Sequence, residues 1–210
     1  MSKLIKVDYI NQSDKFPTGC ESISTIMCLH YWEIDITPEE FIDKYLEKGN
    51  IIKKNEQLYA PNPFDKFVGS PYLEYSFGCY EPVIEKALNK LILDKQLNFE
   101  VINLNNAPMN TIIKDYIDKD IPVIFWATMD LKESYYSRIW TVPETGEKYQ
   151  WKAKEHCMLL VGYDIEKEGY YFNDPLNNNG IILYNKALVE KRHEEQFSNA
   201  IAIVKKNYKI

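Results

Sequence analysis

The sequence lacks several features that would assign its class at once. Its four cysteines form no CxxC pair, which argues against a zinc site and a thioredoxin-like redox motif. No apolar run approaches the roughly 18 to 20 residues of a membrane span, and the start MSKLIKVDYINQ has neither an apolar core nor a small-residue cleavage site. We therefore expect no membrane partner and a cytoplasmic protein, or a secreted one if a signal peptide has been removed.

The chain also lacks a basic stripe. Its formal net charge is −6, and Lys and Arg are scattered among Asp and Glu, so we expect no nucleic-acid partner. The 210 residues, 45% hydrophobic and 27% charged, predict a single folded domain over residues 1–210 with one core. A chain of this size does not need disulfide bonds to fold. Cys20, Cys28, Cys79 and Cys157 are therefore predicted to be free thiols in a reducing compartment.

Helical patterns come first along the chain and strand patterns later, which predicts an α+β domain. The helices are expected at residues 20–32, from Thr37 to about Lys48, and at about 81–93 and 110–119. A mainly antiparallel sheet is expected from strands at 121–127, 139–142, 148–152, 157–163, 169–173, 181–184 and 200–204, with a short charged helix near 186–196. Residues 49–79 show no sustained period and are interpreted as a long ordered loop that could form a substrate wall.

Cys20 is the one cysteine at an expected helix start, after Pro17-Thr18-Gly19. A free cysteine with a pKa of about 8.5 is only a few per cent thiolate at neutral pH, and the positive end of a helix dipole favours the anion. Gly19 would allow the backbone to bend closely into the helix. Cys20 is thus a candidate nucleophile, against the simpler interpretation of a small buried residue at a helix end.

Three histidines could supply a base for this thiol. His30 lies ten residues into the same helix, about 15 Å along its axis from Cys20, which is too far. His193 lies within KRHEEQ, which is interpreted as a solvated helix face. His156 stands at the entrance to the apolar strand CMLLVGY, and elimination makes it the expected general base.

An imidazole base needs an acceptor that fixes its tautomer and stabilises the imidazolium. A hairpin between the strands at 157–163 and 169–173 would bring Asp174 within a few residues of His156 across the ladder. The alternative is that Asn173-Asp174-Pro175 is an ordinary turn at a strand end. The developing oxyanion also needs donors, and either Asn11 or Gln12 could join the Cys20 N–H in that role.

At these residues the chain resembles the family-39-like cysteine peptidases, papain-like enzymes related to the peptidase domains that remove double-glycine leaders from bacteriocins. The resemblance is carried by YINQ…PTGCESISTIMCLHYW, FVGSPYLEYSFGCYEP, the Trp-rich hairpin running into EHCMLLVGYD, and YYFNDPL. It implies a papain-like fold, with the nucleophile helix packed on a C-terminal antiparallel sheet. By the same resemblance, Gln12 is the oxyanion donor, Cys20 the nucleophile, His156 the base and Asp174 the residue that orients it.

Two departures from that family limit what is carried over. The leader-processing enzymes are normally attached to transporters, and this chain has no transporter segment, so their substrate is not assigned to it. Glu21 follows the nucleophile where many of the similar proteins have glycine. The predicted function is hydrolysis of a peptide or protein substrate through a Cys20 thioester, with no cofactor or metal. The alternatives are an acyltransferase or amidase with the same residues, or a catalytically silent peptide-binding protein; the sequence does not indicate an oligomeric state.

Overall fold

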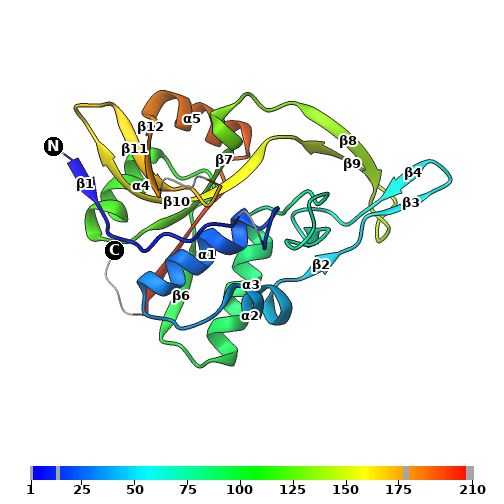
Figure 1. The fold of residues 1–210 in the computed structure, drawn as a ribbon, viewed down its shortest axis with the longest axis horizontal. Coiled ribbons are helices and arrows are strands. Elements are labelled where there is room, and N and C mark those ends of the chain that lie inside the picture. The colour runs from blue at the N-terminus through cyan, green and yellow to red at the C-terminus, as the bar shows by residue number, and fades with distance from the viewer. Residues whose placement is uncertain (1, 13–14, 177–179, 207–210) are drawn as a thin grey trace.

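The fold, described by a computed structural model over residues 2–12, 15–176 and 180–206, is built on one large antiparallel sheet (Figure 1). Its strands follow the order β12-β11-β10-β7-β13-β6, and β1 adds a further pairing to β10. The bounds of these strands are β1 (Ser2–Leu4), β6 (Phe99–Asn103), β7 (Val123–Thr128), β10 (Glu155–Asp164), β11 (Gly169–Asn173), β12 (Ile181–Asn185) and β13 (Ala200–Lys205). The strands expected at 121–127, 157–163, 169–173, 181–184 and 200–204 are therefore present in this sheet, whereas those expected at 139–142 and 148–152 belong to a second sheet. The strand β7 is buried at every position because both faces of the main sheet are covered.

Helices cover the two faces of this sheet. The helix α1 (Cys20–Tyr31) packs against β10 and β7 and lies below them in Figure 1, whereas α5 (Lys186–Glu195) packs on β7, β11 and β12 from above. The helix α3 (Glu81–Asp94) packs on β6 and β13, and α4 (Met109–Asp115) continues into the 3₁₀ turn η2 (Ile117–Lys119). All residues of α1 from Cys20 to Leu29 are buried, as its nearly all-round apolar pattern predicts.

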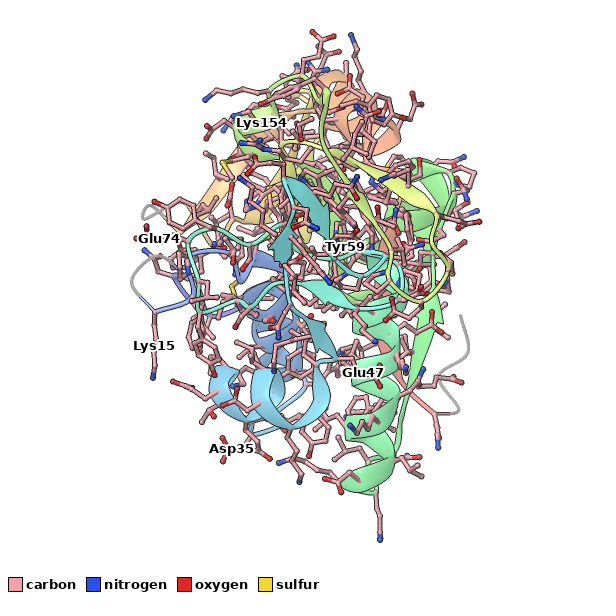
Figure 2. All side chains as sticks on the ribbon, turned by 90° about the vertical axis from the view of Figure 1, so that its right-hand side faces the viewer. Lys15, Asp35, Glu47, Tyr59, Glu74 and Lys154 are labelled. Atoms are coloured by element: carbon pink, nitrogen blue, oxygen red, sulfur yellow. The ribbon has the colours of Figure 1, made fainter. Side chains whose placement is uncertain are left out.

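The segment predicted as a loop at 49–79 contains strands, so that prediction is wrong in part. A second sheet follows the order β3-β4-β8-β9, with β3 (Ile52–Lys54), β4 (Gln57–Tyr59), β8 (Tyr136–Thr141) and β9 (Lys148–Lys152). A short parallel pair joins β2 (Lys48–Gly49) to β5 (Phe67–Val68). Figure 2 views the molecule from the side of this second sheet, with Tyr59 at the end of β4 near the centre.

The second predicted helix is shorter than expected. Its start is as predicted, since the Thr37 hydroxyl accepts a hydrogen bond from the Glu40 N–H at 3.1 Å. The helix consists of α2 (Pro38–Glu40) and the π-turn η1 (Phe41–Tyr45). It ends there because Leu46 is extended and leads the chain into β2.

The interpretation of His193 as part of a solvated helix face is wrong. His193 is 3% exposed, its ring stacks on Phe125 with centroids 3.9 Å apart, and its Nδ1 donates to the Trp126 carbonyl at 2.7 Å. The reason is tertiary: α5 lies flat on β7, so the helical period turns Val189, Arg192 and His193 toward the sheet. Burial lowers the pKa of His193 to about 4, although its hydrogen bond to Trp126 acts in the opposite direction.

All four cysteines are buried free thiols. None of the helices within the described ranges is long and apolar enough to cross a bilayer.

Candidate active site

The N-terminus of α1 is built around a glycine that a larger residue could not replace without movement. A Cβ atom on Gly19 would lie 2.8 Å from the Cβ of Phe16, and the Gly19 N–H donates to the Phe16 carbonyl at 2.9 Å. The Gly19 carbonyl then accepts from the Ile23 N–H at 2.9 Å. This tight turn starts the helix at Cys20, as the sequence predicts.

A cavity of about 240 Å³ opens beside this helix end. Cys20 and His156 line the same cavity, so the helix from the first half of the chain and the strand β10 from the second half meet there. Gln12 also lines it. The other lining residues come mainly from the segment before α3 and from the turns around β9, and they are Pro17, Thr18, Ser76, Phe77, Met129, Tyr135, Trp151, Ala153, Lys154, Glu155 and Leu176.

His156 forms a buried hydrogen bond with Asp174. The His156 Nε2 lies 2.7 Å from the Asp174 Oδ1, and the two side chains are almost fully buried. The pairing of Leu159 with Asn173 across β10 and β11 sets this proximity. Since Asp174 occupies Nε2, Nδ1 is the ring nitrogen left to exchange a proton in the cavity.

Asp174 is itself fixed by two further donors. The Tyr184 hydroxyl donates to its Oδ2 at 2.7 Å and the Leu176 N–H donates to its Oδ1 at 3.0 Å. Burial alone would raise the pKa of Asp174, but the hydrogen bond and charge of His156, together with Tyr184 and Leu176, hold that pKa below its usual value. An ionised carboxylate is therefore aimed at the imidazole.

The two candidates for the oxyanion donor lie in different surroundings. Gln12 is 1% exposed and lines the cavity, whereas Asn11 is exposed and does not. The Gln12 Nε2 donates to the Pro17 carbonyl at 3.1 Å, and its backbone N–H donates to the Pro175 carbonyl at 3.0 Å. One N–H of the Gln12 amide is thus bonded to the Pro17 carbonyl, and Gln12 lines the cavity that Cys20 also lines.

Two acidic residues near the thiol had no predicted role. The Cys20 thiol donates to the Glu21 Oε2 at 3.3 Å, and a ligand atom of Glu155 lies within 4.8 Å of both groups. Burial raises the pKa of Cys20 well above its usual value, and the charges of Glu21 and Glu155 add to this, while a backbone hydrogen bond from Cys157 opposes it. These effects work against the helix dipole, which the sequence predicts to favour the thiolate.

A sequence signal for Glu155 was available. Residues 155 and 157 are two apart on β10 and so share a face, and an interpretation that assigns Cys157 to the core places Glu155 on the same side. Cys157 is indeed fully buried, and its carbonyl accepts from the Ser24 hydroxyl of α1 at 3.1 Å.

The other histidine and cysteine candidates do not line the cavity. His30 is exposed and its Nε2 lies 2.8 Å from the Ile36 carbonyl oxygen. Cys28 and Cys79 are fully buried, and the Cys79 N–H donates to the Glu21 Oε1 at 2.7 Å. In the described part of the chain, the residues grouped closely enough to hold a metal ion are Cys20, Glu21 and Glu155.

Comparisons with known proteins agree with this architecture. Over residues 4–201 the chain matches the model of the Peptidase_C39 like family. A crystal structure described as that of a candidate C39-like peptidase from Bacillus anthracis superposes with a TM-score of 0.82 at 22% sequence identity, covering 98% of each chain. At that identity the likeness concerns the fold, which is the predicted α+β papain-like fold. A search of curated proteins found no significant match. The chain belongs to the Peptidase_C39 like family.

Proposed function

We propose that this protein is a cysteine peptidase in which Cys20 is the nucleophile, His156 the general base and Asp174 the residue that orients the base. The observation that carries the proposal is the meeting of Cys20 and His156 at one cavity while Asp174 holds the His156 Nε2 at 2.7 Å. Cys20 is far from His156 and Asp174 in the sequence, and nucleophilic acyl transfer needs the three groups that these residues supply: a nucleophile, a base and an acceptor that orients the base.

In the proposed reaction, the Cys20 thiol proton passes to the His156 Nδ1 as the sulfur attacks the carbonyl carbon of the scissile peptide bond. The resulting oxyanion accepts hydrogen bonds from the Cys20 N–H and from the Gln12 amide. The imidazolium then gives its proton to the leaving amine as the C–N bond breaks, leaving a thioester on Cys20. Water, deprotonated by His156, attacks the thioester, so that the acid product departs and the thiol is restored.

The surroundings of the cavity favour an extended peptide as substrate. Met129 and Tyr135, which line the cavity, are 37% and 57% exposed, so the site offers accessible apolar surface to the side chains of a bound peptide. Ser76 and Phe77 also line a neighbouring hollow of about 700 Å³ over the second sheet, where Tyr75 is 89% exposed. A chain lying across both hollows would place apolar side chains on either side of the scissile bond.

Two other functions use the same residues differently. An acyltransferase or amidase would pass the Cys20 acyl group to an amine acceptor or cleave a non-peptide amide, since the fold does not dictate the bond. Stable transfer to an added amine would identify it. A silent binding protein would hold a peptide in the same hollows without cleaving it. The bond between His156 and Asp174 supports a catalytic function over this last one.

The test is the reaction of Cys20 with iodoacetamide across pH, mapped by mass spectrometry, together with cleavage of a mixed peptide library. In wild type, Cys20 should alkylate far faster than Cys28, Cys79 and Cys157, and His156→Ala should abolish that advantage and the cleavage. The matched control is His30→Ala, which removes an exposed imidazole and should change neither. Equal alkylation of Cys20 in wild type and His156→Ala would refute the catalytic assignment and favour the binding protein.

A further inference from the structure

A pair of buried carboxyl groups lies beside the nucleophile, and the reaction proposed above does not use it. Glu21 is fully buried and Glu155 is 8% exposed. Glu21 directs one oxygen to the Cys20 thiol at 3.3 Å and the other to the Cys79 N–H at 2.7 Å. The sulfur and one oxygen from each carboxyl lie within 4.8 Å of one another.

Neither carboxyl of the pair forms a salt bridge with a basic side chain in the part of the chain that the structure describes. Among the described residues, the Glu155 Oε1 is buried without a hydrogen-bond partner. Two ionised carboxylates this close in a buried site repel each other strongly, so the pair retains a proton. The titratable or charged groups that face the pair come from α1, β10, β9 and the segments before α3 and β10, and they are Cys20, His156, Cys157, Cys79, Tyr80, Tyr149 and Lys154.

We propose that Glu21, backed by Glu155, is a positioning residue that controls the proton on the nucleophile. While its carboxylate is ionised, it accepts the hydrogen bond of the Cys20 thiol and opposes a negative charge on the sulfur. When it takes up a proton, that opposition is lost and the thiol proton is free to pass to His156. This inference rests on the proposed function, because it concerns how the same nucleophile becomes reactive.

The direction of titration follows from the surroundings of each carboxyl. Burial raises the pKa of Glu21 to about 6, against the hydrogen bonds from its own N–H and that of Cys79. Burial and then the charge of Glu21 raise the pKa of Glu155 well above its usual value. Glu155 therefore holds its proton more strongly than Glu21, and Glu21 is the first member of the pair to ionise, as the pH rises through about 6.

The experiment measures the rate of Cys20 alkylation by iodoacetamide between about pH 4 and 9 in the presence of EDTA, so that no metal ion masks the thiol. In wild type the rate should fall as the pH rises through about 6, before it rises again as the bare thiol ionises. Glu21→Gln keeps an oxygen for the Cys79 N–H but cannot ionise. In this variant the rate of Cys20 alkylation should not fall as the pH rises through about 6. Near pH 7.5 its Cys20 should be alkylated about tenfold faster than that of wild type, which corresponds to one unit of thiol pKa.

Two further variants define the result. Glu155→Gln should keep the fall, because Glu21 retains its charge. Glu100→Gln, on the exposed face of β6 at the far edge of the main sheet, is the matched control and should follow wild type throughout. A wild-type profile without a fall, a fall that survives in Glu21→Gln, or a fall that is lost in Glu155→Gln would each overturn the inference.

The variants need not all fold for the test to decide. If circular dichroism shows that Glu21→Gln is unfolded, the wild-type and Glu155→Gln profiles still support or overturn the assignment as stated. Failure of the inference is also distinct from failure of the proposed function. The former leaves Cys20 reactivity dependent on His156, whereas the latter makes Cys20 indifferent to His156→Ala.

Discussion

Acid should destabilise this protein through His193, which is on α5 and so lies on the opposite face of the main sheet from α1. Its Nδ1 donates to the Trp126 carbonyl at 2.7 Å, and its Nε2 is buried with no hydrogen-bond partner among the described residues. A proton added at Nε2 would therefore create a buried charged donor without an acceptor. His193→Asn is the perturbation, because the Asn amide can still donate to the carbonyl but does not titrate.

The magnitude follows from the difference in pKa between the two states. The pKa of His193 falls from 6.5 to about 4 on folding, so the unfolded chain binds the proton first. The stability associated with neutral His193 is complete above pH 6.5 and is lost as the pH falls toward 4. At about 1.4 kcal/mol per pKa unit, this loss amounts to about 3 kcal/mol between neutral pH and pH 4.

The assay is urea unfolding followed by tryptophan fluorescence at several pH values from about 4 to 7. Glu21 has a raised pKa and acts with the opposite sign, but it is present in both proteins and cancels in their difference. The gap in unfolding free energy between wild type and His193→Asn should narrow by about 3 kcal/mol as the pH falls. A gap that is independent of pH would refute the reasoning.

Two further predictions concern the site and its support. Asp174→Asn should lower the rate of substrate cleavage by about 10²- to 10⁴-fold, because an amide cannot stabilise the His156 imidazolium, and a rate equal to wild type in a cleavage assay would contradict the orienting role. Gly78→Ala should lower the unfolding free energy by about 1 to 3 kcal/mol in urea titrations, since its φ is +106° and a Cβ would lie 2.6 Å from a Glu21 oxygen. Gly146 also has a positive φ, +76°, but a Cβ added there would meet nothing within 4 Å. Gly146→Ala therefore measures the backbone strain alone and should lower the unfolding free energy by less than Gly78→Ala does.

Predictions from the sequence succeeded where a local pattern was strong. The apolar run after Gly19 predicts a buried helix that begins at Cys20, and the structure has that helix. The strand after His156 and its hairpin partner are also predicted, because alternation and a short connection specify an antiparallel pair. Elimination among three histidines selected the one that lines the cavity.

Predictions failed where the determining contact was distant in the chain. The strands β3 and β4 have only three residues each, and β4 is joined to β8, which lies more than seventy residues later, so no local period reveals them. His193 lies in a charged segment, and only its stacking on Phe125 shows that it faces the core.

The sequence by itself determined most of the helices and strands and singled out Cys20, His156 and Asp174 as candidates for nucleophile, base and orienting residue, because periodicity and residue chemistry are local properties. Only the tertiary structure decided that Gln12 and not Asn11 faces the cavity, and that Glu21 and Glu155 form a carboxyl pair beside the thiol. The physical reason is that burial and the distance between charges arise when α1 packs on β10. Those two quantities, more than residue type, set which of these groups carries a proton.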